Sequence, residues 1–156
     1  MRATAVLDLD ISVARQWSNV ELLRGAVQTC ALAAEVDAET VRRVALAFAE
    51  LCENGIKYGS AGESHIRVHV SIEPAAAHIR VESPLAAGEG VPLPLVRALE
   101  DIEHAEAFAA KVEAIAGTDS PAGGLGLARL AHEGCRLRAE VHGDWLAVIA
   151  ELSRST

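Results

Sequence analysis

Two polar side chains in the middle of the chain have the types and spacing to do chemistry. Glu50 and Asn54 stand four residues apart in the segment Glu50-Leu51-Cys52-Glu53-Asn54-Gly55-Ile56-Lys57-Tyr58. If this segment is helical, both side chains project from one face, one turn apart. A carboxamide oxygen can bind Mg²⁺, and a carboxylate can accept a proton from an attacking hydroxyl or water. The pair therefore has the parts for a metal-assisted reaction.

The same residues also fit the solvated face of an ordinary amphipathic helix. An apolar seam lies on one side of this segment, and the polar side chains lie on the other. Taken alone, the pattern is typical of a surface helix and does not require a site. The seam consists of Val41, Val44, Ala45, Phe48 and Cys52, and the polar side consists of Arg43, Glu50, Asn54 and Lys57.

A second candidate lies near the C-terminus, where glycines open an apolar helical pattern. The segment reads Gly123-Gly124-Leu125-Gly126-Leu127-Ala128-Arg129-Leu130. Glycines at a helix entry let phosphate oxygens approach backbone N–H groups that the helix leaves unpaired, and the helix dipole favours the negative charge. A glycine cluster is also typical of a hinge, so the motif counts only in a matching structural context. Here an apolar helix follows directly.

Composition narrows the class of protein. A chain of 156 residues is long enough for one domain, which we place at 1–156, with its own hydrophobic core. Its 14 Lys and Arg against 22 Asp and Glu argue against nucleic acid as the main partner, because that affinity comes from clustered cations. The three cysteines stand apart in apolar runs, which is typical of reduced thiols. With neither a signal-peptide pattern nor a membrane-spanning apolar run, we expect a cytoplasmic protein with no membrane partner.

The elements that must position the two motifs follow from hydrophobic periodicity. Their order, and the polar outer faces of the hairpins, predict a two-layer α/β (α+β) sandwich. Its mixed, mostly antiparallel sheet carries helices on one face. We expect strands at 5–11, 65–73, 78–83, 136–142 and 145–151, and helices within 18–34, 38–58, 94–116 and 125–133.

Cap residues predict where the first two helices begin and end. Ser18 and Glu21 form a capping-box pattern for the first helix, although Ser12 is an alternative start. Asp37 caps the second helix, which should end near Tyr58 because a glycine-rich stretch follows.

Turn residues predict two antiparallel hairpins. A four-residue loop at Pro74–Ala77 would pair Glu73 with His78. Gly143-Asp144 suits a type II′ turn between the last two strands. In that register, one face of the second hairpin carries Leu137, Ala139, Val141, Leu146, Val148 and Ala150.

Together the two motifs resemble the GHKL ATPase superfamily, which is shared by gyrase, histidine kinases and MutL. Within it, the chain is similar to the small stand-alone anti-sigma-factor serine kinases, in a divergent branch. Glu50-Leu51-x-x-Asn54, continuing to Lys57-Tyr58, is similar to the asparagine-containing box, and Gly124-Leu125-Gly126-Leu127 to the second glycine box. The order of elements fits over nearly the whole chain. The resemblance implies the histidine-kinase-like ATPase fold.

The resemblance also implies roles for individual residues. Glu50 would be the general base, and Asn54 would bind Mg²⁺ as the companion of ATP. The implied partners are an antagonist-type or sigma-factor-like regulatory protein, and a second copy of the chain bound through residues 12–34. The implied nucleotide-binding residues are Asn54, Lys57, Tyr58, Ser83, Gly123, Gly124, Leu125, Gly126 and Leu127.

One departure from the family pattern separates two hypotheses. Where the family has an aspartate that binds adenine, this chain reads Val81-Glu82-Ser83-Pro84, with Ser83 expected on the inward face. A serine offers one hydroxyl and no carboxylate. One hypothesis is an ATP-dependent protein serine/threonine kinase in partner-switching signalling. The other is a non-catalytic partner-switching module with a degenerate nucleotide site. Retention of both Glu50 and Asn54 favours ATP binding.

Overall fold

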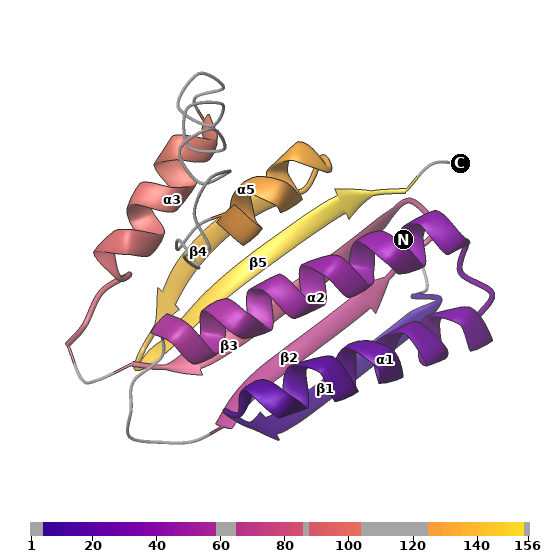
Figure 1. Ribbon diagram of the computed structural model, residues 1–156, viewed down its shortest axis with the longest axis horizontal. Coiled ribbons are helices and arrows are strands. Elements are labelled where there is room, and N and C mark those ends of the chain that lie inside the picture. The colour runs from indigo at the N-terminus through magenta and orange to yellow at the C-terminus, as the bar shows by residue number, and fades with distance from the viewer. Residues whose placement is uncertain (1–4, 59–64, 86–87, 104–124, 155–156) are drawn as a thin grey trace.

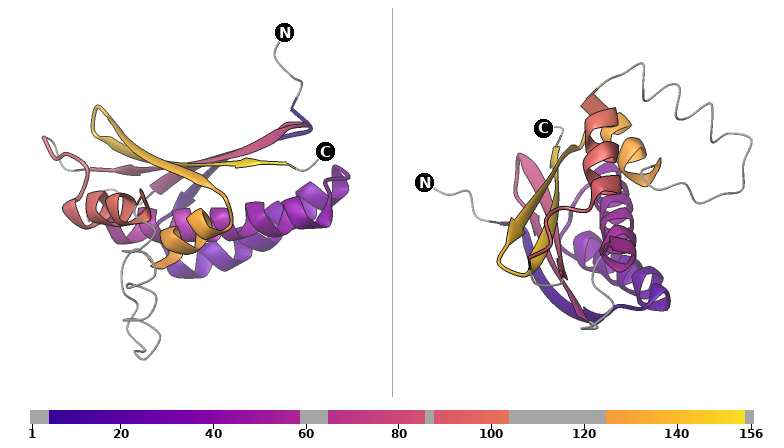
Figure 2. Two further views of the ribbon diagram at one scale, coloured as in Figure 1. Left: turned by 90° about the horizontal axis from the view of Figure 1, so that it is seen from above. Right: turned by 90° about the vertical axis from the view of Figure 1, so that its left-hand side faces the viewer.

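Two layers make up the structure, a five-stranded sheet and a set of helices that cover one of its faces (Figures 1 and 2). The computed structural model describes residues 5–58, 65–85, 88–103 and 125–154. The predicted two-layer sandwich is confirmed. In chain order the elements are β1 (Leu7–Ala14), α1 (Trp17–Ala33), α2 (Ala38–Tyr58), β2 (His65–Ile72), β3 (Ala76–Pro84), α3 (Leu93–Glu103), α5 (Leu125–His132), β4 (Arg136–His142) and β5 (Trp145–Ser153).

The sheet has the strand order β1-β2-β3-β5-β4, and every pair of described neighbours is antiparallel. The sheet was expected to be mixed, so the structure is more uniform than the sequence pattern suggested. The order brings the C-terminal strand β5 against β3, where Ser83 pairs with Leu146. Ser83 therefore lies on the central strand of the sheet, close to the end of that strand.

The core lies between the inner face of the sheet and the helices. Alternate residues of β2 and β3 point inward, as their period-two pattern predicts. Helix α2 supplies the apolar seam that meets them, and burying each such side chain contributes about 1.5–3 kcal/mol to folding. Fully buried members include Phe48, Leu51, Ile66, Ile72, Ile79, Leu127, Leu130, Leu146 and Leu152.

The N-terminus of α2 is held by the predicted cap. The backbone N–H of Thr40 donates a hydrogen bond to Asp37 Oδ2 at 2.9 Å. This bond, together with the nearby Arg154 guanidinium, lowers the pKa of Asp37 to about 2. The helix ends at Tyr58, as predicted.

The expected capping box of α1 is wrong. Strand β1 continues to Ala14, where it still pairs with His65 of β2, so Ser12 lies in the strand and only two residues remain for the turn. The helix then begins at Trp17 with Gln16 as its N-cap, which makes no side-chain capping bond, and Ser18 already lies inside the helix. Asn19 supports the turn instead, because its Nδ2 donates to the Ala14 carbonyl at 3.1 Å.

The predicted register of the first hairpin is also wrong, by two residues. Ser71 pairs with His78, and the N–H of Glu73 donates to the carbonyl of Ala76 at 2.8 Å, so the turn is Pro74-Ala75. A shift of two residues keeps every side chain on its expected face, because the side-chain period of a strand is two.

The second hairpin and the later helices agree with their predicted places. Leu137 pairs with Ala150 as expected, and Gly143 adopts a φ of 59° in the connecting turn. Helix α3 begins at Leu93, but residues 104–116 of the expected long helix lie outside the described residues. Within the described ranges, none of the helices combines the length and apolarity required to cross a bilayer.

Candidate functional site

The two sequence motifs meet where α5 packs beside α2 on the inner face of the sheet (Figure 1). Glu50 and Asn54 belong to the C-terminal half of α2, and Gly126 is the second residue of α5. Gly123 and Gly124 lie outside the described residues. The second glycine box is therefore described from Leu125 onward.

Glu50 is not on a solvated helix face. Its side chain is only 17% exposed, because α5 covers it. A Cβ added at Gly126 would overlap the Glu50 carboxylate, so only a glycine lets that carboxylate lie against the backbone of α5. The glycine box and the candidate base are thus in direct contact.

The surroundings of Glu50 change its acidity. Burial raises the pKa of the Glu50 carboxyl, and the neighbouring Glu53 carboxylate raises it further. Arg129 opposes both effects, with its Nη1 at 3.7 Å from Glu50 Oε1. A carboxylate with a raised pKa accepts a proton more readily near neutral pH, which suits a general base.

Asn54 lies one turn beyond Glu50 on the same face of α2 and is half-buried. Within the described part of the chain, no residue forms a hydrogen bond with its carboxamide. The amide oxygen is therefore available to a metal ion or ligand. Lys57 follows as an exposed cation, and Tyr58 is the last residue of the helix.

Ser83 is buried against α2, which confirms its predicted inward orientation. A Cβ added at Gly55 would lie 2.9 Å from Ser83 Oγ and 3.1 Å from Val81 Cγ1. Strand β3 thus passes closer to α2 here than a larger residue at 55 would allow. The Ser83 hydroxyl is thus packed against the backbone of α2 at Gly55.

Not every predicted residue offers its side chain to the site. Leu127 is buried in the core, so any contact it makes with a ligand must come from its backbone. The sequence reading missed Arg129, which stands three residues after Gly126 on the same side of α5. That spacing was the available signal, but the ion pair with Glu50 depends on how α5 packs on α2.

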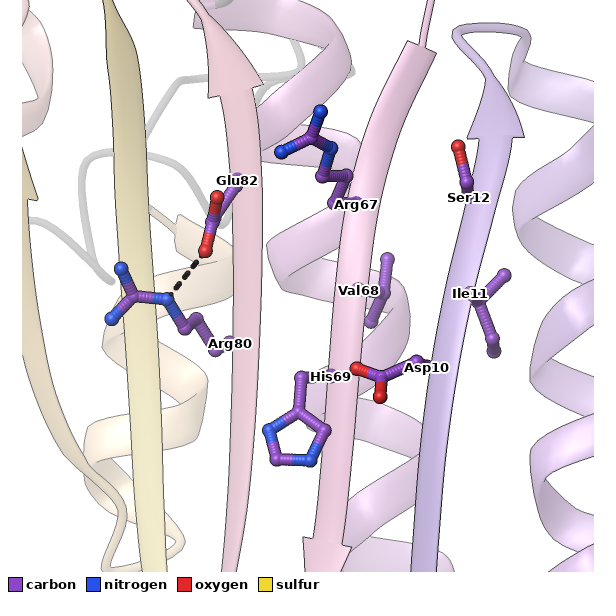
Figure 3. A pocket seen from close by; sticks show the side chains of 8 residues that line it. All are labelled: Asp10, Ile11, Ser12, Arg67, Val68, His69, Arg80 and Glu82. Atoms are coloured by element: carbon purple, nitrogen blue, oxygen red, sulfur yellow. Dashed lines mark hydrogen bonds and ion pairs between the residues drawn. The ribbon is translucent and has the colours of Figure 1, made fainter. Parts of the chain in front are cut away.

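A hollow on the opposite face of the sheet contains none of the predicted site residues (Figure 3). It measures about 320 Å³ and crosses β1, β2 and β3. Three of its polar groups have partners: Arg80 Nε donates to Glu82 Oε1 at 2.8 Å, the Arg67 guanidinium stacks on the Trp145 ring at 4.3 Å, and His69 pairs with Asp8. The lining residues are Asp10, Ile11, Ser12, Arg67, Val68, His69, Arg80 and Glu82.

Comparison with family models identifies the chain. Residues 13–133, which include both motifs, match the model described as histidine kinase-like ATPase domain. The chain belongs to this family. The match runs from β1 to the end of α5 and confirms the expected superfamily.

A solved structure supports the same fold. The chain resembles a chain in the crystal structure of the SiaB-SiaC complex from Pseudomonas aeruginosa, with a TM-score of 0.65 and 17% sequence identity. The alignment covers 92% of this chain and 88% of that chain. None of the curated proteins matches the sequence significantly.

Proposed function

We propose that the protein binds ATP with Mg²⁺ between the C-terminal half of α2 and the start of α5, and acts in bacterial partner-switching signalling. The observation that carries this proposal is the Glu50 carboxylate, which is largely buried against Gly126 and lies one turn from Asn54. The family match supports it, because the family is one of ATPase domains. An ordinary solvated helix face has no physical need for this arrangement.

The residues present fit a magnesium nucleotide. Asn54 offers a hard oxygen donor without a protein partner among the described residues, as Mg²⁺ requires. Bound Mg²⁺ would neutralise charge on the phosphates. The nucleotide would be held by Lys57, Tyr58, Ser83 and residues 123–127, with the phosphates near the N-terminus of α5.

Two activities are compatible with such a site, and we favour a protein serine/threonine kinase. In that case Glu50 accepts the proton of the attacking hydroxyl, and its raised pKa suits the task. The alternative is a non-catalytic module that switches partners. The buried Ser83 hydroxyl supports this alternative, because it cannot bind adenine as a carboxylate does.

The proposed partner is an antagonist-type or sigma-factor-like regulatory protein in the cytoplasm. The similar solved structure is a complex of two proteins, which supports a protein partner. We further propose a homodimer through α1. This helix exposes apolar side chains that a second copy would cover, among them Trp17 at 58% and Leu22 at 71% exposure.

Isothermal titration with ATP and Mg²⁺ tests the nucleotide site. We expect binding in the wild type, and at least tenfold weaker binding, roughly 1.4 kcal/mol, in Asn54→Ala. Gln16→Ala is the control, because this exposed amide makes no capping bond. A folded wild type that binds no ATP up to millimolar concentrations contradicts the proposal.

A phosphate-transfer assay distinguishes the protein kinase from the non-catalytic partner-switching module. Protein that binds ATP is incubated with the candidate antagonist and ATP labelled at the terminal phosphate. Labelled antagonist with the wild type, and none with Glu50→Gln, supports the kinase. Nucleotide binding without any transfer favours the module.

A further inference from the structure

Arg129 lies where α5 faces the Glu50 carboxylate. Gly126 and Arg129 are three residues apart in α5, so they share one side of the helix. Gly126 admits the carboxylate to the helix backbone, and Arg129 Nη1 lies 3.7 Å from its Oε1. The same side of α5 thus supplies both the space for Glu50 and its charge partner.

Arg129 is the group that opposes protonation of Glu50. From α2 itself, Glu53 adds a second negative charge, and burial raises the pKa of Glu50 further. Of the charged groups on the described elements packed around α2, only these two, Glu53 and Arg129, shift it. Among the charged side chains that act on Glu50, Arg129 is the one that favours the ionised form of the carboxylate.

The guanidinium of Arg129 is only loosely engaged. A separation of 3.7 Å allows an ion pair but exceeds hydrogen-bond length, and the side chain is 55% exposed. No further partner for it is present among the described residues. A guanidinium carries five N–H donors in a planar fork that matches phosphate oxygens. Arg129 therefore keeps donors available beside the proposed phosphate site.

We propose that Arg129 is a positioning residue that keeps Glu50 ionised and seated against Gly126, and that nucleotide phosphates compete with Glu50 for its guanidinium. Binding of the nucleotide then weakens the ion pair, which raises the proton affinity of the carboxylate that Arg129 has kept ionised. The competition half of this inference rests on the proposed function. The positioning half concerns the protein without nucleotide.

A pH titration of the Glu50 side-chain carboxyl by carbon-13 NMR tests the positioning role. We expect a higher pKa for Glu50 in Arg129→Gln than in the wild type, and a return toward the wild-type value in Arg129→Lys. Arg136→Gln removes an exposed cation from β4 and serves as the control. A Glu50 titration that does not respond to Arg129→Gln overturns the positioning role.

A double-mutant cycle on Mg-ATP affinity tests the competition. Glu50→Gln should increase Mg-ATP affinity by about threefold or more beyond the increase that it causes in the Arg129→Gln background. The reason is that Glu50→Gln frees a guanidinium for the phosphates only where Arg129 is present. Equal gains in both backgrounds overturn the competition. Near-ultraviolet circular dichroism of each variant confirms that it is folded.

The two experiments separate this inference from the proposed function. If the wild type binds no ATP, the proposed function fails and the competition fails with it, whereas the titration still decides the positioning role. If the wild type binds ATP and the pKa of Glu50 is the same in the wild type and in Arg129→Gln, the inference fails and the proposed function stands.

Discussion

The two halves of α2 differ in how their polar side chains are used. In the N-terminal half, Arg43 Nη1 donates to the Ser153 carbonyl and its Nη2 to the Glu133 carbonyl, both at 2.8 Å. Arg42 binds the carboxylates of Glu39 and Glu133. This half is tied to α5 and to the end of β5, and its polar groups are satisfied within the protein.

The C-terminal half of the same helix makes few such bonds. Glu50 has one loose ion pair, and Asn54 has no hydrogen-bond partner among the described residues. On the side that faces the sheet, Gly55 nevertheless packs tightly against Ser83. This half is therefore held by packing at Gly55 and by the hydrogen bond from Arg15 Nη2 to the Ile56 carbonyl at 2.7 Å, while Glu50 and Asn54 keep polar atoms available.

Anchoring and the candidate chemistry are therefore separated along one helix. The bonds of the N-terminal half hold α2 in place without any ligand. The C-terminal half can then carry a largely buried carboxylate and a half-buried carboxamide without losing its position. Variants in the two halves should consequently affect stability and ligand binding separately.

The largest loss of stability is expected from Arg43→Ala. Two backbone carbonyls lose a charged donor, and such hydrogen bonds contribute about 1.5–3 kcal/mol, so we expect a loss of about 2 kcal/mol. Urea denaturation measures it. Arg42→Ala, which removes exposed ion pairs only, is the control and should cost less. A larger loss of stability in Arg42→Ala than in Arg43→Ala would contradict the distinction between anchoring hydrogen bonds and surface ion pairs.

Gly55→Ala should destabilise the protein by about 1–2 kcal/mol, because its Cβ would meet Ser83 Oγ and Val81. The matched control is Gly25→Ala in α1, where a Cβ meets nothing within 4 Å. That change should stabilise the protein by about 0.5–1 kcal/mol through helix propensity alone. Thermal unfolding of both variants measures the contrast, and a neutral Gly55→Ala would argue against the tight crossing.

Asp37→Ala should lower stability by about 1 kcal/mol at neutral pH, because the cap of α2 is lost. The folded-state pKa of Asp37 is depressed from 3.8 to about 2. The stabilisation by the ionised carboxylate is therefore complete above pH 3.8 and disappears as the pH falls through about 2.

Denaturation of the wild type and Asp37→Ala at pH 7 and near pH 2 measures this dependence. Asp37→Asn is the control, because it keeps an oxygen acceptor for the Thr40 N–H but has no charge. A difference between wild type and Asp37→Ala that stays constant over this range would show that charge does not contribute.

Asn54→Ala should change the free energy of unfolding least, within about 0.5 kcal/mol, because no described bond is lost and alanine favours helix. Nucleotide binding should nevertheless be weakened. Denaturation and titration on the same preparation measure both. A stability loss comparable to that of Arg43→Ala would remove the contrast between the two halves.

Local sequence chemistry predicted much of the fold. The Asp37 cap and the end of α2 at Tyr58 depend on neighbouring residues, and both are confirmed. The predicted cap at Ser18 was wrong because β1 pairs with β2 as far as Ala14, and α1 then begins with Gln16 as its N-cap. The predicted register of the first hairpin was wrong by two residues, because the alternation of apolar and polar residues determines which face a side chain occupies, whereas the turn determines the register.

The candidate site was predictable only in part. The spacing of Glu50 and Asn54 and the glycines of α5 are visible in the sequence. Burial of Glu50 and its pairing with Arg129 arise from packing between helices far apart in the chain. No local pattern distinguishes that carboxylate from a solvated one.

Amide chemical-shift mapping by NMR during titration with Mg-ATP would locate the nucleotide on the protein. We expect shifts concentrated at Glu50, Asn54 and Gly126, with little change at Arg42 and Arg43. Shifts concentrated in the hollow on the outer face of the sheet, or none at saturating nucleotide, would contradict the proposed site.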